Sequence, residues 1–113
     1  MKANDTLNAV QDLLPAIRRR RQEIEHARRM PRDLVEDFRR AGIFSLGVPR
    51  AIGGKEVNPM ELMRTVEMLA TADGSAGWCA MIGTANNVVA GYMNEARARE
   101  VFADPTAPTV PVA

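Results

Sequence analysis

The chain has 113 residues, of which 46% are hydrophobic and 26% charged, and its formal net charge is +1 at pH 7. This composition suits one small globular domain and excludes a disordered chain. Because the charges nearly balance, composition favours neither a nucleic-acid nor a membrane partner. The single cysteine, Cys79, excludes an internal disulfide bond. Since the N-terminus has no apolar signal core, we expect a cytoplasmic protein.

Residues 5–29 are predicted to form a helix with Asp5 or Thr6 as the N-cap. Its apolar stripe consists of Leu7, Val10, Leu14, Ile17 and Ile24. Pro15 should kink or split this helix, because it lacks a backbone donor and clashes with the preceding turn. The arginines at 18–21 suggest nucleic-acid binding, but glutamates follow two of them at a spacing of four residues. Ordinary surface ion pairs are the better interpretation, so we expect no nucleic-acid partner.

The stretch 30–54 is predicted to be a short helix followed by an extended run and a turn. Pro31 suits the first helical position, and Gly42 suits a left-handed residue just beyond the helix end. The buried face should comprise Leu34, Val35, Phe38 and Ala41. Residues 43–48 should then run extended into Pro49, before Gly53-Gly54 turns the chain.

Two further helices are predicted beyond this turn. Asn58 should cap the first, whose inner face should carry Leu62, Met63, Val66, Leu69 and Ala70. Ser75 should cap the second, which runs to Tyr92 without a charged residue. Interspersed glycines and the pair Asn86-Asn87 argue against a transmembrane span. Because the other helices each offer a single apolar stripe, one side of this helix should need another domain or chain to cover it.

A last short helix is predicted at residues 95–102, followed by a proline-rich tail at residues 105–113. The sequence shows no motif typical of a nucleophile–base pair, a phosphate-binding loop or a cluster of metal ligands. His26 lies among charged residues and is expected to be a surface side chain, while Cys79 and Gly83 are expected to be packing residues.

The order of these signals resembles the N-terminal helical domain of the acyl-CoA dehydrogenase superfamily of flavoproteins. Ala41-Gly42-Ile43, Val48-Pro49 and Gly53-Gly54 carry the resemblance, which covers roughly residues 7–104. The segment from Ala72 to Trp78 is more similar to the branch of reduced-flavin-dependent aromatic monooxygenases than to the dehydrogenases. The chain departs from the family at Arg50-Ala51-Ile52, where relatives often carry charged and aromatic residues.

The resemblance implies an all-α domain of four to five helices at residues 1–104, with the tail at 105–113 marking the boundary to a β-domain. The sequence lacks that β-domain and the C-terminal helical bundle. The cofactor of the parent protein would be FAD or FMN, and its substrate an acyl-CoA or an aromatic compound. Binding of flavin by this chain alone is not expected, because the motifs that hold it lie in the absent domains.

In relatives the matching helix forms a wall of the substrate cavity beside the flavin. By resemblance, that wall would consist here of Ser75, Trp78, Met81, Ile82 and Asn86. The alternative assigns Trp78 to the core, Ser75 to capping alone and Asn86 to neighbouring backbone. Two functional classes therefore remain open: the first domain of a flavin-dependent oxidoreductase that meets its missing domains or forms a homo-oligomer, and a stand-alone helical interaction module without catalysis.

Overall fold

A computed structural model describes residues 3–108, and every regular element in this part of the chain is helical. The elements are α1 (Ala3–Arg19), α2 (Arg21–Ala27), α3 (Arg32–Ala41), η1 (Ile43–Ser45), η2 (Arg50–Ile52), α4 (Pro59–Ala72), α5 (Gly74–Ala85), η3 (Asn86–Tyr92) and α6 (Glu95–Val101), where η marks a 3-10 helix. The all-α prediction is confirmed, with six α-helices in the described residues in place of four or five. None of these helices is long and apolar enough to cross a membrane.

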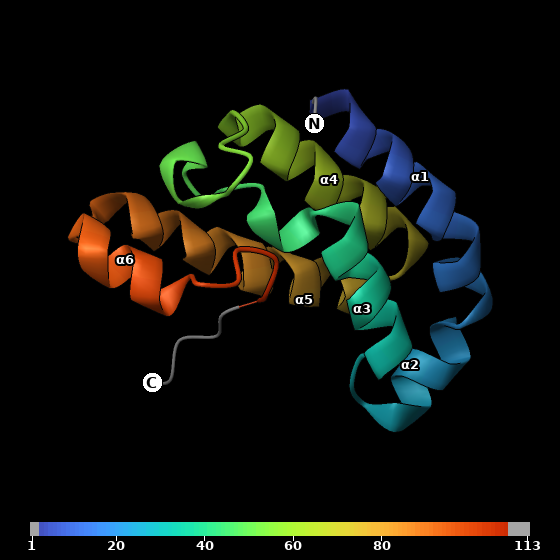
Figure 1. Ribbon diagram of the computed structural model, residues 1–113. Helices are drawn as coiled ribbons and strands as arrows, with labels where there is room; N and C mark the ends of the chain where they lie inside the picture. Colours follow the sequence, from blue (N-terminus) through green and yellow to red (C-terminus); the bar gives the residue numbers. More distant parts are fainter. Residues whose placement is uncertain (1–2, 109–113) are drawn as a thin grey trace.

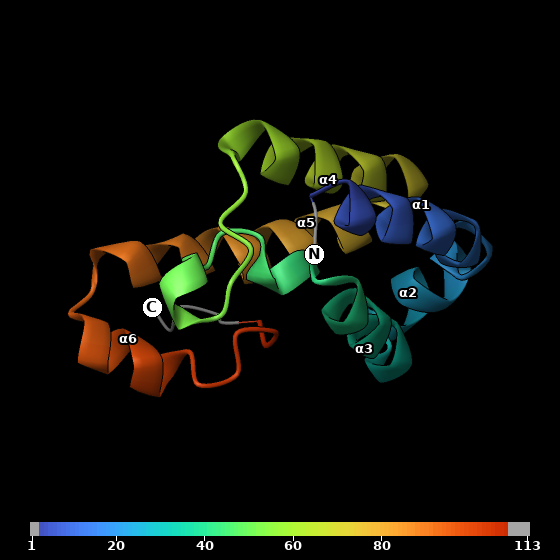
Figure 2. The ribbon, with the colours of Figure 1, turned by 45° about the horizontal axis from the view of Figure 1, so that its top comes forward.

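The helices are arranged around α4 and α5, which lie side by side (Figures 1 and 2). Helix α1 packs along α4, and α3 with η1 closes the core from the other side. Helix α6 lies at the end of the molecule opposite α2 (Figure 1). The main core draws large side chains from the first half of the chain, including Ile17, Phe38 and Phe44. Helices α4 and α5 contribute Leu69 and several alanines.

The N-terminal helical region divides at Arg20, and α1 continues through Pro15, so Pro15 does not split the helix. Pro15 lies on the exposed side of α1. Because proline has no N–H, the carbonyl one turn earlier lacks its helical partner, and on this side of the helix water can bind it instead. At Arg20 the guanidinium donates to Glu23 and to Asp33, with shortest distances of 2.6 Å to each, and so connects α2 to α3. Hydrogen bonding to Arg20 lowers the pKa of Asp33. The ion pairs predicted at spacings of four residues are not the ones that form.

The start of α1 also differs from the prediction, because neither Asp5 nor Thr6 is the N-cap. Asp5 lies within the first turn, and Thr6 is buried. The hydroxyl oxygen of Thr6 accepts a hydrogen bond from the Lys55 Nζ at 2.6 Å, which joins α1 to the loop before α4. Burial lowers the pKa of Lys55.

The stretch around α3 has the predicted turn at Gly42 but differs from the prediction at the start of the helix and at residues 43–45. Gly42 adopts a left-handed conformation at φ 82°, as predicted, and its N–H donates to the Arg39 carbonyl. Pro31 is the N-cap and not the first helical residue. Residues 43–45 form η1 instead of an extended run, because one tight turn there buries Ile43 and Phe44 together. Three residues of the predicted buried face, Leu34, Phe38 and Ala41, are buried, and the fourth, Val35, is half-buried.

The turn at Gly53-Gly54 brings the chain back over residues 45–48. Gly53 has φ 96°, and a Cβ on Gly54 would lie 2.0 Å from the Val48 carbonyl oxygen. The backbone N–H of Lys55 donates to the Ser45 carbonyl at 2.9 Å, which holds the chain after the turn against residues 45–48. Both glycines are therefore required by the backbone conformation or by the close approach.

Helix α4 begins as predicted but presents a different face to the core. The Asn58 Oδ1 accepts from the Glu61 N–H at 3.0 Å, which confirms the N-cap. The fully buried residues are Thr65, Leu69 and Ala72, whereas Met63 is 62% exposed. Thr65 tolerates this burial because its hydroxyl donates to the Glu61 carbonyl at 2.9 Å.

Asp73, not Ser75, caps α5. The Asp73 side chain accepts from the Ala76 N–H at 2.8 Å, while its own N–H donates to the Leu69 carbonyl and ends α4. One residue thus ends one helix and begins the next, so α4 and α5 are joined by a minimal connection. Gly77 then packs directly on Ala70: a Cβ at position 77 would lie 2.6 Å from the Ala70 Cβ.

We predict that Gly77→Ala lowers the free energy of unfolding by about 1–3 kcal/mol, because the added methyl forces α4 and α5 apart. Gly74→Ala is the matched control on the same helix, since no heavy atom lies within 4 Å of a Cβ built there. It should be neutral or stabilise by less than about 1 kcal/mol, as alanine is the better helix former. Urea unfolding of both variants checks this, and equal stabilities would contradict the close contact.

Candidate functional site

Helix α5 buries one side and leaves the other open. Its buried residues are small or short: Ala76, Gly77, Ala80, Gly83 and Thr84. On the open side Trp78 is 63% exposed, while Met81 and Ile82 are half-buried. This difference between the two sides of α5 agrees with the prediction that the other helices of the domain cover only part of it. The open side includes the residues proposed as a cavity wall.

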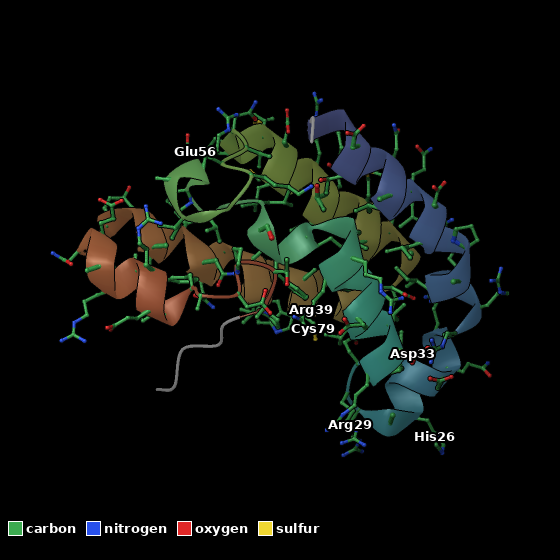
Figure 3. All side chains as sticks on the ribbon, viewed as in Figure 1. His26, Arg29, Asp33, Arg39, Glu56 and Cys79 are labelled. Atoms are coloured by element: carbon green, nitrogen blue, oxygen red, sulfur yellow. The ribbon has the colours of Figure 1, made fainter. Side chains whose placement is uncertain are left out.

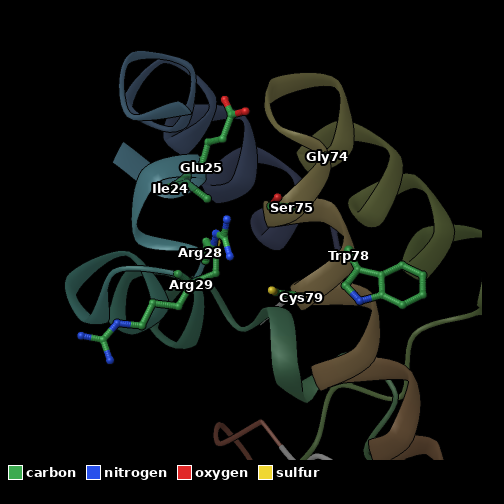
Figure 4. A pocket seen from close by; sticks show the side chains of 9 residues that line it. Ile24, Glu25, Arg28, Arg29, Gly74, Ser75, Trp78 and Cys79 are labelled. Carbon is green, nitrogen blue, oxygen red and sulfur yellow. The ribbon is translucent and has the colours of Figure 1, made fainter. Parts of the chain in front are cut away.

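A groove runs between the open side of α5 and the turn that joins α2 to α3 (Figure 4). It consists of two adjoining hollows of about 420 and 400 Å³ that share five residues. The shared residues are Arg28, Arg29, Met30, Trp78 and Cys79. We call this feature the α5 groove.

The two ends of the α5 groove differ in polarity. The upper end is completed by Ile24, Glu25, Gly74 and Ser75, so it combines charged and hydroxyl groups. The lower end is completed by Val35, Phe44, Ile82, Gly83 and Pro108, none of which carries a charge. The upper end is therefore the more polar of the two, while both arginines and several apolar side chains line each end.

The structure divides the five proposed site residues. Ser75, Trp78 and Ile82 line the α5 groove, with the Trp78 indole directed away from the two arginines (Figure 4). Met81 lies over a separate apolar hollow of about 390 Å³ shared with α4. The Asn86 Nδ2 donates to the Ile82 carbonyl at 2.7 Å, as the alternative interpretation expected.

The groove offers recognition groups but no evident catalytic machinery. Burial raises the pKa of the Cys79 thiol, with a smaller contribution from Asp73, so the thiol stays protonated at neutral pH. Cys79 is exposed, which makes its prediction as a packing residue wrong, whereas Gly83 packs against the Phe44 ring as predicted. His26 is exposed, as predicted, and lies with Arg29 at the outer end of α2 (Figure 3). Across residues 3–108 no cluster of acidic, histidine or cysteine side chains could hold a metal ion.

The sequence analysis did not assign several wall residues to the site, among them Arg28, Met30, Phe44 and Pro108. They are distant in sequence from α5, and no local pattern marks them as its neighbours. Gly83 is the one sequence feature that indicates a close neighbour of α5. Because it has no side chain, the Phe44 ring can lie within 2.7 Å of the position a Cβ would take.

The chain after α6 packs back onto the domain and places Pro108 at the groove. The buried Asn87 donates to the carbonyls of Phe44 at 2.8 Å and Ala107 at 3.2 Å. The Ser45 hydroxyl donates to the Pro105 carbonyl at 2.8 Å. Residues 105–108 form neither a helix nor a strand, and residues 109–113, the rest of the predicted proline-rich tail, lie outside the described residues.

An ion pair reinforces the same attachment. The Arg39 guanidinium lies 2.5 Å from the Asp104 carboxylate and 3.3 Å from the Thr106 hydroxyl (Figure 3 shows Arg39). Hydrogen bonds from Thr106, with the Arg39 charge, lower the pKa of Asp104. Ionised Asp104 therefore stabilises the fold.

We predict a pH-dependent effect of Asp104→Asn. Its loss of stability at pH 7 should be at most about 1 kcal/mol, because the carboxylate is half exposed to solvent. Because the pKa of Asp104 is lower in the folded state, the ionised carboxylate stabilises the fold at pH values above the ordinary aspartate pKa of about 3.9. This stabilisation is lost as the pH falls through the folded-state pKa. The difference between wild type and variant should therefore vanish at low pH in urea titrations. Asp12→Asn, an exposed change on α1, is the control, and a pH-independent difference would contradict the assignment.

The comparisons identify a family. The domain described as "Acyl-CoA dehydrogenase, N-terminal domain" matches residues 7–103. The chain is 35% identical over 77 residues to the indole-3-acetate monooxygenase of Pseudomonas putida, covering 66% of this chain and 20% of that protein. It is 31% identical over 102 residues to HsaA, the oxygenase subunit of a flavin-dependent monooxygenase of Mycobacterium tuberculosis, covering 90% of this chain and 26% of that subunit.

The fold agrees with these relatives. A crystal structure of the HsaA monooxygenase from M. tuberculosis superposes with a TM-score of 0.88 at 33% identity. The match covers 96% of this chain and 30% of the HsaA chain. The chain thus spans between a fifth and a third of the length of these relatives.

Proposed function

The chain belongs to the family of acyl-CoA dehydrogenase N-terminal domains, and on this basis we propose that it is the N-terminal helical domain of a flavin-dependent oxidoreductase. We place it with the monooxygenases, because the relatives at 31–35% identity carry that name. The single observation that supports a role at the substrate is the open side of α5, where Trp78 is 63% exposed. A large aromatic side chain left open in this way is typical of a surface that another group covers.

In this proposal the open side of α5 forms one wall of the substrate cavity. Ser75, Trp78 and Ile82 would face substrate through the α5 groove. Met81 would act from the flank of α5 by apolar contact, and Asn86 from the start of η3 by shaping the surface at the end of α5. The domain itself is taken as residues 1–104, with residues 105–113 leading into the next domain.

Flavin, as FAD or FMN, would be held by the other domains of the parent protein and would supply the redox chemistry. The contribution of this domain is to bind and orient the substrate against the cofactor and to exclude water. The apolar open side would be covered by those domains or by a second copy in a homo-oligomer. Consistent with this division of labour, we expect the 113-residue chain alone to be inactive.

Two alternatives remain. The parent protein would be an acyl-CoA dehydrogenase if its substrate were a thioester, although the named relatives favour an aromatic compound. The chain would be a stand-alone helical interaction module if the fold had been kept without the chemistry.

Activity of the complete gene product tests the proposal. With reduced flavin and oxygen, we expect hydroxylation of an aromatic substrate and no desaturation of acyl-CoA with an electron acceptor. Desaturation would select the dehydrogenase alternative. A folded, flavin-loaded protein with neither activity would contradict the proposal and leave the interaction module. Tight stoichiometric binding of FAD or reduced FMN to the 113-residue chain would refute the assigned division between domains.

We predict that Trp78→Ala in the complete protein changes substrate choice without unfolding the domain. Removing a large apolar wall should alter the ratio of kcat/KM for two aromatic substrates of different size by roughly 10–200-fold. The melting temperature should change little, because the indole is mostly exposed. Tyr92→Ala is the matched control, since Tyr92 is 87% exposed and lies outside the groove. Equal effects of the two substitutions would contradict the role of Trp78.

A further inference from the structure

We propose that the arginine-rich corner of the domain, around α2, is a docking surface for an acidic segment of another polypeptide. Its members are the exposed arginines Arg18, Arg19, Arg21, Arg28, Arg29 and Arg32, which we call the arginine corner. Four of the six lie outside the α5 groove. The proposal therefore concerns a second surface, goes beyond the proposed function and does not depend on it.

Charge is distributed unevenly along the chain. Residues 18–33 contain seven arginines and three acidic residues, a net charge of +4, whereas the whole chain carries +1. They form the last turn of α1, all of α2 and the first turn of α3, at the end of the molecule opposite α6 (Figure 1). The molecule is 42 Å long, and the Debye length at physiological ionic strength is about 8 Å. Acidic residues at the far end therefore do not neutralise this corner.

The acidic residues of the segment leave most of its positive charge uncompensated. Glu23 and Asp33 both bind Arg20, at 2.6 Å each, so they are engaged by the one arginine of the segment that lies outside the arginine corner. Within residues 3–108, the arginines with side-chain ion pairs are Arg20, Arg39, Arg40, Arg97 and Arg99. Six guanidiniums are therefore left with Glu25 as the remaining acid of the segment.

The element across the α5 groove does not supply the missing negative charge. Helix α5 has no charged residue between Gly74 and Ala85. The carboxylate of Asp73, just before it, accepts a hydrogen bond from the Ala76 N–H at 2.8 Å. The arginine corner is thus open to an anionic partner from outside the domain.

The composition of the corner favours a partner that presents carboxylates. All seven cations of residues 18–33 are arginine, and none is lysine. A guanidinium can donate two parallel hydrogen bonds to one carboxylate, and arginine is enriched at protein interfaces where lysine is depleted. An acidic polypeptide segment therefore matches both the charge and the donor geometry of this surface.

Two other anionic partners fit less well. A nucleic acid would bring only negative charge against Glu25, and residues 18–33 contain no phenylalanine, tyrosine or tryptophan on which bases could stack. A lipid surface would need exposed apolar anchors beside the arginines. The two large apolar side chains of the segment, Ile24 and Met30, pack on the core instead.

Binding of an acidic peptide to the 113-residue chain tests the proposal. The probe is fluorescein-labelled decaglutamate, followed by fluorescence anisotropy at a physiological ionic strength of about 0.15 M. We expect saturable binding that weakens as the salt concentration rises, because the contacts are exposed ion pairs. A labelled glycine–serine peptide of equal length should not bind.

A triple variant assigns the binding to the arginine corner. Arg18→Gln, Arg21→Gln and Arg32→Gln together remove three exposed members that lie outside the α5 groove. The variant should bind decaglutamate about tenfold more weakly, because each exposed ion pair contributes roughly a factor of two. Its melting temperature should stay close to that of the wild type, since these side chains are exposed.

The matched control removes the same charge from other exposed positions. It combines Arg50→Gln in η2, Arg64→Gln in α4 and Arg97→Gln in α6. Its affinity for decaglutamate should fall by less than about threefold, because these positions act only through the screened net charge. Thermal melting of both triple variants checks that each keeps the fold.

Failure of decaglutamate to bind saturably, equal binding of the neutral peptide, or equal losses in the two triple variants would each overturn the proposal. Duplex DNA and phosphatidylserine vesicles test the other partners at the same ionic strength. Tighter binding to the duplex than to decaglutamate, or cosedimentation with the vesicles, would assign the arginine corner to a different class of partner and overturn the proposal as well.

Discussion

The close contact between α4 and α5 is the constraint on which the rest of the fold depends. Asp73 ends one helix and begins the other, so the two must turn back on each other within one residue. They can do so only because Gly77 presents no side chain to Ala70. Small residues on the packed side of α5 bring the backbones together and leave its larger side chains, Trp78 among them, on the open side. The same constraint that builds the core therefore exposes the candidate site.

A second set of contacts determines what lies beside that open side. The polar side chains of Asn87, Ser45 and Arg39 hold residues 104–107 across the domain. The burial of Asn87 is tolerated because its amide donates to two backbone carbonyls. These bonds carry Pro108 to the groove wall. The chain thus leaves the last helix along the candidate site and not away from it.

Sequence patterns predicted features that depend on a few neighbouring residues. The turn at Gly42, the cap at Asn58 and the uncovered side of the helix after Asp73 are of this kind. The break at Arg20 and the 3-10 turn at residues 43–45 depend instead on partners distant in sequence, respectively Asp33 and the shared core. The cap of α5 is Asp73 and not the predicted Ser75, because the aspartate that ends α4 also accepts from the Ala76 N–H.

The candidate site was predictable only in part, for a related reason. The family resemblance assigned five residues to a cavity wall, and four of them lie on α5, with Asn86 at the start of η3. The relatives share this fold. Periodicity along one helix, however, says nothing of what stands opposite. The α2–α3 turn brings Arg28 there, because Arg28 itself takes a left-handed conformation at φ 55° that ends α2 and redirects the chain toward α5. The polarity of the groove therefore arises from tertiary packing, which joins an arginine-bearing turn to an uncharged helix that the sequence pattern treats separately.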